Sequence, residues 1–318
     1  MVGCGAIGGY YGAKLAHAGQ NVHLLLRSDY QAVLNQGISV TSPDGNFTTR
    51  PLCARTPEEI GPSDLVIIGL KTTANDQLPG LLRSLVTPTT AVLTLQNGLG
   101  NEEALSRLFP REQILGGLCF VCLNRTAPGR ITHTGHGRIL LGEFQRTSTA
   151  RTLHLSALFQ QAGIDCQVVD DLARAHWEKL VWNIPFNGLG VAAAAGWESC
   201  AAPSTSTRIS QIRHPVMPTD LLLADPRWES LVLELMLEII NTANALGFAI
   251  PESYATLQIN RTRSLGSYRA STLIDFDRGQ PLELESLFLE PLRQAQAAGV
   301  PTPRLETLSR VLMRLSGL

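Results

Sequence analysis

The sequence predicts a two-domain α/β protein, with a mostly parallel sheet and its crossover helices followed by an all-helical domain. The chain has 318 residues, which corresponds to about two domains at roughly 150 residues each. From Met1 to about Cys166, short β-rich runs alternate with helical stretches, as in a parallel sheet with crossover helices. After Asp170 the periodicity is helical and strand signals are few. The predicted domains are residues 1–168 and 169–318.

Four apolar runs are expected to form strands of the sheet. They are NVHLLL (21–26), DLVIIGL (64–70), AVLTLQ (91–96) and ILGGLCFV (114–121). The segment GRITHTGHGRILLGE (129–143) has two β-like runs around Thr134 to Gly137, which predicts an antiparallel hairpin that closes the first domain. Its His133 and His136 are expected to be exposed hairpin residues, because no third metal ligand accompanies them.

The second domain is expected to contain a series of helices. They are a helix that begins near Asp171, the run PRWESLVLELMLEIINTANALG, and residues 269–278, 282–298 and 303–317. The stretch between Ala192 and Asp225 is rich in Ser, Thr and Pro, which predicts a long loop or mobile insertion.

The composition excludes several classes of protein. Apolar residues make up 44% and charged residues 17% of the chain, which is typical of a globular protein. Lys+Arg is 26 against Asp+Glu 27, a balance that does not fit a nucleic-acid-binding protein. Lysine is rare. The 26 basic residues comprise 23 arginines and three lysines, which are Lys14, Lys71 and Lys179. Either base composition explains this bias, or some lysines stand where an arginine is too basic to release a proton.

The cysteines and the apolar runs indicate a cytoplasmic protein. Six cysteines are scattered along a chain that is too long to need disulfides, and no signal sequence precedes them. Cys119 and Cys122 form a C-x-x-C, but in a buried strand they would point to opposite faces, so no metal or redox site is expected. No apolar run reaches the ~18 residues that span a bilayer. We expect no membrane or nucleic-acid partner, and a homodimer is compatible with the sequence.

A glycine motif opens the chain. Gly3, Gly5 and Gly8 form a G-x-G-x-x-G that leads into a helical pattern and a second strand, which is the context of a Rossmann dinucleotide-binding fingerprint. The glycines permit a tight turn and the close approach of a pyrophosphate to the helix N-terminus. Only Met1 and Val2 precede the motif, so either the natural start lies upstream or the first strand is clipped. Alternatively, the glycines are turn residues of a site that no longer binds a nucleotide.

The end of the second strand favours NADP over NAD. An NAD enzyme would place an acid here, whereas this chain has Leu26-Arg27-Ser28, and a cation suits the 2′-phosphate of NADP. Asp29 keeps NAD open, and Arg27 could also be a solvated strand-end residue.

A polar stripe follows the first helix of the second domain. Lys179, Asn183 and Asn187 are spaced four residues apart, which places them on one helix face among apolar neighbours. This pattern indicates a polar pocket, or alternatively a hydrogen-bonded contact between domains. Pro185 is expected to kink the helix and to retilt Asn187 relative to Lys179.

With these motifs in order, the chain resembles the ketopantoate reductases (2-dehydropantoate 2-reductases) over nearly its whole length. The matching segments are GCGAIGGYYGAKLAHAG, the strand-end Arg27, GLKTT, LQNGLGNEE, THTGHGRILLGE, HWEKLVWNIPFN and STLIDFDRGQPLELESL. The resemblance implies a Rossmann domain followed by a helical domain like the C-terminal domain of 6-phosphogluconate dehydrogenase, with the active site between them. It also implies NADPH-dependent reduction of 2-dehydropantoate in pantothenate biosynthesis.

The resemblance further implies a role for each matching residue. Lys179 corresponds to the proton donor, and Glu283 to an acid near the donor and the cofactor. The expected substrate-binding residues are Asn97, Asn183, Asn187 and Ser271. The expected cofactor-binding residues are Gly3, Cys4, Gly5, Ala6, Ile7, Gly8, Arg27, Lys71, Asn97 and Glu283.

Some features keep other interpretations open. Without the resemblance, Ser271 would be a helix N-cap and Glu283 a first-turn acid. The segment from Asn187 to Pro226 is longer than usual in the family, and Gly188 stands where proline is common. The alternatives are therefore a reductase of another branched 2-keto acid, or a catalytically silent NADPH-binding protein.

Overall fold

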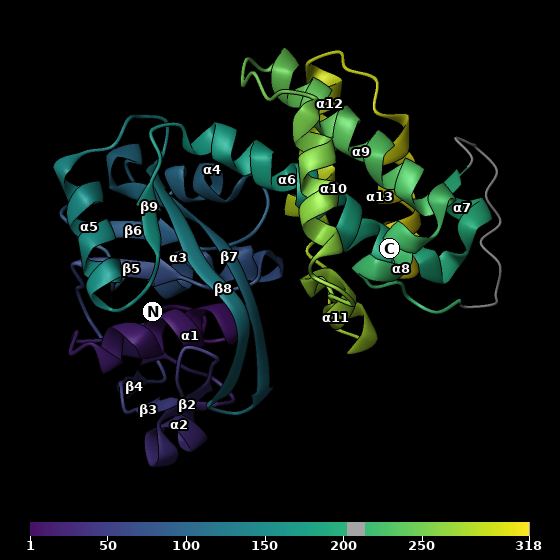
Figure 1. Cartoon of the computed structure of the whole chain (residues 1–318). Coiled ribbons are helices and arrows are strands. Elements are labelled where there is room, and N and C mark those ends of the chain that lie inside the picture. The colour runs from purple at the N-terminus through teal and green to yellow at the C-terminus, as the bar shows by residue number, and fades with distance from the viewer. Residues whose placement is uncertain (202–213, 318) are drawn as a thin grey trace. The chain divides into compact units, whose positions relative to one another are not determined.

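The computed structural model describes residues 1–201 and 214–317 (Figure 1). The chain forms two compact units, Met1–Ala175 and His176–Leu318. The first unit holds all the strands of the described chain, and the described part of the second unit is helical, as the sequence predicts.

The first unit is built on a mostly parallel sheet. Its strands are β1 (His23–Leu25), β2 (Ile38–Thr41), β3 (Phe47–Thr49), β4 (Leu52–Ala54), β5 (Leu65–Ile68), β6 (Ala91–Thr94), β7 (Ile114–Ala127), β8 (Arg130–Glu143) and β9 (Cys166–Val168). Seven of them follow the order β3-β2-β8-β7-β6-β5, with β9 also paired to β8, and β1 pairs with β4 in parallel. The pairs β5–β6 and β6–β7 are parallel, which is the arrangement that the alternating pattern predicts.

Val2 joins the two parts of this sheet. It forms parallel bridges to Leu25 of β1 and to Ile68 of β5. Its N–H donates to the carbonyl oxygen of Ile67 at 2.8 Å, and its own carbonyl accepts from the N–H of Gly69 at 2.8 Å. The strand that a Rossmann fingerprint requires before its glycines is thus represented by this one bridging residue.

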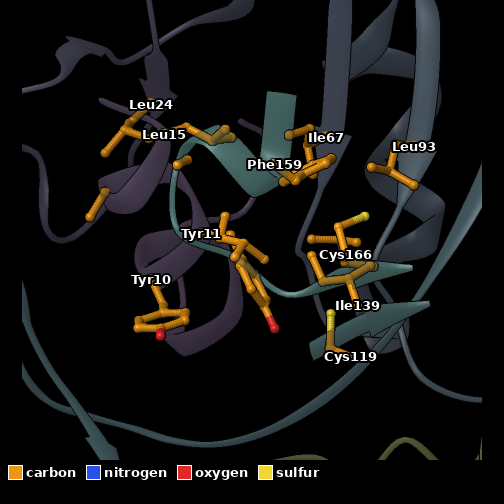
Figure 2. Packing of buried hydrophobic residues seen from close by; sticks show 14 of the residues in the cluster. Tyr10, Tyr11, Leu15, Leu24, Ile67, Leu93, Cys119, Ile139, Phe159 and Cys166 are labelled. Atoms are coloured by element: carbon orange, nitrogen blue, oxygen red, sulfur yellow. The ribbon is translucent and has the colours of Figure 1, made fainter. Parts of the chain in front are cut away.

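Helices cover the sheet through two separate apolar clusters. The helices of this unit are α1 (Ala6–His17), α2 (Tyr30–Gln36), α3 (Leu78–Leu82), α4 (Asn101–Ser106) and α5 (Ala150–Gln161), with short 3-10 turns η1 (Pro57–Glu59), η2 (Thr72–Gln77) and η3 (Arg111–Gln113). Leu24 and Ile67 pack with Tyr11 of α1 and Phe159 of α5 in one cluster (Figure 2). Their strand neighbours point the other way, into a cluster with α3 and α4. Because successive strand residues face opposite sides, both faces of the sheet are buried.

The turn of the predicted hairpin is misplaced. The hairpin joins β7 to β8 around Pro128 and Gly129, and residues 130–143 form one strand instead of two. The prediction of a turn at Thr134 to Gly137 is wrong because bulges in this long ladder break the alternation of apolar residues. Gly129 has a φ of +66°, which a tight turn often requires.

His133 is likewise not an exposed hairpin residue. Only 2% of it is exposed. Its Nδ1 lies 2.8 Å from Ser42 Oγ and its Nε2 lies 3.0 Å from the carbonyl oxygen of His136. His136 itself is exposed, as expected. Both ring nitrogens of His133 are engaged in internal hydrogen bonds, which makes this residue part of the packing.

A buried carboxylate joins the end of β8 to the start of α5. Glu143 accepts hydrogen bonds from Thr149 and Thr152, and it pairs with Arg146 and Arg151. Burial raises the pKa of a carboxyl, but the bonds from Thr152, Arg151 and Arg146 outweigh that effect and hold the pKa of Glu143 below its usual value. Its charged form therefore stabilises this joint.

The described part of the second unit consists of helices and helical turns. They are α6 (Leu172–Ala192), η4 (Ala193–Ala195), α7 (Trp197–Ala201), α8 (Thr219–Ala224), α9 (Pro226–Ala245), α10 (Ser253–Arg263), α11 (Ser271–Asp277), the π turn η5 (Glu285–Leu289), α12 (Glu290–Ala297) and α13 (Pro303–Leu315). Helix α6 begins in the first unit and continues through Pro185 without a break in its helical assignment. The predicted loop at 192–225 contains η4, α7 and α8, so that prediction is wrong for these parts, while residues 202–213 lie outside the described residues.

Two further observations concern the cysteines and the apolar character of the helices. The six cysteines, all among the described residues, form no disulfide, and Cys119 and Cys122 of the C-x-x-C differ in burial. In residues 1–201 and 214–317, no helix has both the length and the apolar composition that crossing a bilayer requires.

Candidate active site

The glycine loop is shaped to admit a phosphate. Gly3 has a φ of +89°, and a Cβ there would overlap the backbone of Leu70, while a Cβ on Gly8 would overlap the carbonyl oxygen of Gly3. By contrast, a Cβ on Gly5 would meet nothing within 4 Å. Gly3 and Gly8 therefore serve the close packing of the loop, and Gly5 leaves open space at the N-terminus of α1. Free backbone N–H groups at a helix N-terminus fit a pyrophosphate.

The side chains in this loop leave that site without negative charge. Helix α1 has no acidic residue in its first turn, and its N-cap Gly5 carries no side chain. Burial raises the pKa of the Cys4 thiol to about 12, so this thiol stays neutral near pH 7. Of the predicted cofactor-binding residues, Cys4, Ala6 and Ile7 can act through their backbone. This loop fits an anionic dinucleotide by its shape and by its charge.

The other predicted cofactor-binding residues of the first unit follow strands that end at one edge of the sheet. Val2, β1, β5 and β6 run in parallel, so their carboxyl ends lie together. Gly3 follows Val2, Arg27 follows β1 by two residues, Lys71 follows β5 and Asn97 follows β6. Arg27 and Lys71 are exposed and Asn97 is half-buried. In doubly wound sheets, ligands bind outside this edge.

Asp29, which kept NAD open, is committed elsewhere. It is 6% exposed, and its two carboxylate oxygens accept from Arg125 Nη1 at 2.7 and 2.9 Å. The N–H of Gly129 donates to the same carboxylate at 3.3 Å. Asp29 thus ties the start of α2 to the β7–β8 turn, and an acid with these partners is poorly placed to receive ribose hydroxyls.

A network of amide side chains holds the loop that carries Asn97. Asn101 Nδ2 donates to the carbonyl oxygen of Asn97 at 3.1 Å, and Asn75 Nδ2 donates to Asn101 Oδ1 at 3.2 Å. Gln96 Nε2 completes the chain by donating to Asn75 Oδ1 at 2.7 Å. Sequence reasoning missed this support, because its members are brought together by the fold and carry no local motif.

In the second unit, the polar stripe lies on α6 as predicted. Asn183 and Asn187 are 7% and 3% exposed, and Lys179 is half-buried. Apolar side chains of the same helix, such as Leu180 and Ile184, are 1% and 0% exposed. A polar stripe on a buried helix needs polar partners or a polar ligand, since burying an amide without a hydrogen bond costs about 1–3 kcal/mol.

Two predicted substrate-binding residues meet in this unit. Asn187 Oδ1 accepts from Ser271 Oγ at 3.2 Å and from the backbone N–H of Thr272 at 3.1 Å. Ser271 is the first residue of α11, and the N-cap is Ala270. The alternative interpretation of Ser271 as a helix N-cap is therefore wrong. Asn187 on α6 therefore accepts hydrogen bonds from the first two residues of α11.

Gly188, next to Asn187, has a packing role. A Cβ at this position would lie within 3 Å of side-chain atoms of Leu308 and Phe288. The glycine lets α6 approach η5 and α13 closely, which is the physical reason for a small residue here.

Glu283 lies just before the π turn η5. It is 8% exposed, and its carbonyl oxygen accepts from the N–H of Leu287 at 3.3 Å. It precedes the helical residues, which begin at Leu284, so it is not an acid within a first helical turn. Single π turns inside helices occur frequently at functional sites.

Comparisons with known proteins agree with this arrangement. The sequence family "Ketopantoate reductase PanE/ApbA" matches residues 1–146, and "Ketopantoate reductase PanE/ApbA C terminal" matches residues 216–316. A 2-dehydropantoate 2-reductase of Nostoc sp. is 40% identical, with 100% of this chain and 94% of the relative covered.

Solved structures give the same result. A 2-dehydropantoate 2-reductase of Geobacter metallireducens has 46% identity and a TM-score of 0.90, covering 98% of both chains. The enzyme of the same name from Methylococcus capsulatus has 32% identity and a TM-score of 0.85, with 99% and 95% covered. A D-mandelate dehydrogenase solved with NADH and anilino(oxo)acetate shares the fold at 18% identity and a TM-score of 0.83, covering 99% of this chain and 97% of the other.

The fold and the comparisons define an oxidoreductase built from a Rossmann-type sheet domain and a helical C-terminal domain. Within that class, the chain belongs to the ketopantoate reductase family. The resemblance seen in the sequence is thereby confirmed.

Proposed function

We propose that this protein reduces 2-dehydropantoate to pantoate with NADPH, as a cytoplasmic step of pantothenate biosynthesis. The observation that carries the proposal is the stripe Lys179, Asn183 and Asn187 on α6, with Asn187 bonded to Ser271. Family membership supports the reaction type, and the open loop at Gly5 supports a bound dinucleotide.

When bound, NADPH would supply the hydride for the keto carbon. Lys179 donates a proton from Nζ to the carbonyl oxygen, so that one hydride and one proton convert the ketone to an alcohol. A lysine ammonium can release a proton in a desolvated site, whereas a guanidinium cannot. As the family resemblance implies, Glu283 is assigned a place near the proton donor Lys179 and the bound cofactor.

The remaining site residues bind and orient. Asn183, Asn187, Ser271 and Asn97 hold the keto acid. The backbone from Gly3 to Gly8 holds the pyrophosphate, and Lys71 contacts the cofactor. Arg27 binds the 2′-phosphate, and the engagement of Asp29 with Arg125 favours NADPH over NADH.

A direct assay tests the proposal. Purified protein is mixed with NADPH and a panel of 2-keto acids that includes 2-dehydropantoate, and NADPH oxidation is followed by absorbance. We expect the largest kcat/KM with 2-dehydropantoate. Binding of NADPH without turnover of any member would reject the enzyme in favour of a silent NADPH-binding protein.

A second candidate is a reductase of another branched 2-keto acid. The longer segment between Asn187 and Pro226 favours it, because the corresponding connection helps to close the substrate pocket in the family, and here it carries helices α7 and α8. The same panel distinguishes the two, since the substrate with the larger kcat/KM identifies the reaction.

A further inference from the structure

Two arginines follow adjacent strands of the sheet, at the edge where the nucleotide is proposed to bind. Strands β1 and β4 pair in parallel with Leu25 opposite Ala54, and the N–H of Leu26 donates to the carbonyl oxygen of Ala54 at 2.9 Å. Arg55 follows β4 directly and Arg27 follows β1 by two residues, and both are exposed. The carboxyl ends of this strand pair therefore carry two exposed arginines on neighbouring segments of the chain.

The side chain of Arg55 is held in place by an aromatic ring. Its guanidinium carbon lies 4.4 Å from the centroid of the Tyr30 ring. Tyr30 begins α2, and its N–H donates to the carbonyl oxygen of Arg27 at 3.3 Å. The backbone N–H of Arg55 donates to Glu59 Oε2 at 2.8 Å. The stack on Tyr30 thus directs Arg55 toward the turn that carries Arg27.

Neither arginine has its charge neutralised by a carboxylate of the chain. Within residues 1–201 and 214–317, Arg27 and Arg55 form no ion pair, and the nearest acid in sequence to Arg27, Asp29, is bonded to Arg125. Glu59 bonds the backbone of Arg55 and lies farther than 4.0 Å from its guanidinium nitrogens. Two unpaired guanidinium groups on neighbouring strand ends form a site for an anion with several oxygens.

Resting on the proposed use of NADPH, we propose that Arg55 is a second ligand of the cofactor's 2′-phosphate. It acts together with Arg27, and Tyr30 is the positioning residue that orients its guanidinium. A stacked guanidinium loses little rotamer freedom when it binds, and the cation–π contact holds it against the ring even at an exposed site. Arg55 therefore contributes to the preference for NADPH over NADH.

The test compares two nucleotides that differ only by the 2′-phosphate. Calorimetry measures the Kd of 2′,5′-ADP and of 5′-AMP for the wild type, Arg55→Ala and Arg50→Ala. Arg50 is a matched control, since it is exposed and lies just before β4, at the opposite end of the strand, where it bonds the carbonyl oxygen of Asn35. We expect Arg55→Ala to weaken 2′,5′-ADP by about tenfold, the usual effect of losing one charge-assisted hydrogen bond, and to leave 5′-AMP unchanged.

Variants of Tyr30 separate positioning from structure. Tyr30→Phe keeps the ring and should keep the wild-type affinity for 2′,5′-ADP. Tyr30→Leu removes the platform and should lose part of that affinity, with 5′-AMP again unchanged. Thermal unfolding of each variant checks that the fold is kept.

The outcomes separate this assignment from the function on which it rests. Equal losses of both nucleotides in Arg55→Ala would show that Arg55 stacks on the base, and no loss would show a solvated side chain; either result overturns the assignment alone. A wild type that binds both nucleotides equally would overturn the assignment together with the proposed preference for NADPH.

Discussion

The side chain of Asn187 closes the N-terminus of the helix that Ser271 begins. Its Oδ1 accepts from Ser271 Oγ at 3.2 Å and from the N–H of Thr272 at 3.1 Å. This geometry engages the oxygen of the amide twice and assigns Nδ2 to a different partner. In the proposed function, that partner is the keto acid.

Two substitutions of Asn187 should therefore behave differently. Asn187→Asp keeps the accepting oxygen, so the melting temperature should stay close to that of the wild type. It replaces the amide donor by a charge that repels a carboxylate substrate, so we expect KM for the keto acid to rise by about tenfold or more. Asn187→Leu leaves the N–H of Thr272 unsatisfied and should lower the free energy of unfolding by about 1–3 kcal/mol. An unchanged KM in Asn187→Asp would contradict substrate binding by this amide.

Replacing lysine by arginine tests the proton donor. Lys179→Arg should keep the NADPH Kd and lower kcat by about 10²–10⁴-fold, because a guanidinium does not give up its proton. Lys14→Arg is the matched control. Lys14 Nζ donates to the carbonyl oxygen of Gly163 at 2.7 Å, a bond that arginine can also make, so activity should persist. Wild-type kcat in Lys179→Arg would remove this residue from the mechanism.

The glycine loop allows its structural and binding roles to be separated. Gly5→Ala adds a Cβ into open space, so the protein should fold normally while NADPH binding is lost to steric exclusion. Gly8→Ala should instead destabilise the fold, since its Cβ would overlap Gly3. Gly80→Ala, at an exposed position of α3 with nothing within 4 Å of the added Cβ, is the neutral control. Thermal unfolding and NADPH titration together give the result, and full NADPH affinity in Gly5→Ala would place the pyrophosphate elsewhere.

Arg27→Ala addresses the choice of cofactor. The variant should bind NADPH about tenfold more weakly while its affinity for NADH stays the same, because only NADPH carries the 2′-phosphate. Fluorescence titration with both cofactors measures the two affinities. Equal losses would mean that Arg27 contacts a group that both cofactors share.

Glu143 predicts how stability depends on pH. Its pKa is lower in the folded protein than its usual 4.5, so the charged carboxylate stabilises the fold above that pH, and this stability is lost as pH falls through the folded pKa. Glu143→Gln should lower the free energy of unfolding at pH 7 by about 3 kcal/mol, the usual cost of breaking a buried ion pair. Part of the acid-induced loss seen in the wild type should disappear. Unfolding titrations between pH 7 and acid measure both effects, and parallel curves would contradict the assignment.

The sequence predicts those features that depend on neighbours along the chain. The glycine loop, the α6 stripe and the parallel strands follow from short-range patterns, and the structure has all three. The β7–β8 turn was missed because a bulged ladder conceals the period of its strands, although Pro128-Gly129 is a turn signal.

Features that join distant segments could not be read in this way. The pair Asp29–Arg125 spans 96 residues, and Arg55 reaches Tyr30 only because β1 and β4 are adjacent. His133 was expected at the surface because a histidine between polar residues gives no sign of a partner far away in the sequence, such as Ser42. Such pairings depend on strand order, which one sequence does not specify.

The π turn at Glu285–Leu289 sets the angular phase of the residues on either side of it. A π turn holds one residue more than the α-helical turn that it replaces, and each residue of an α-helix accounts for about 100° of rotation. Deleting one residue from this turn would therefore rotate Glu283 by about a quarter of a revolution relative to α12. The insertion decides which way that acid faces, so the length of this short segment is as tightly specified as the identity of the residues around it.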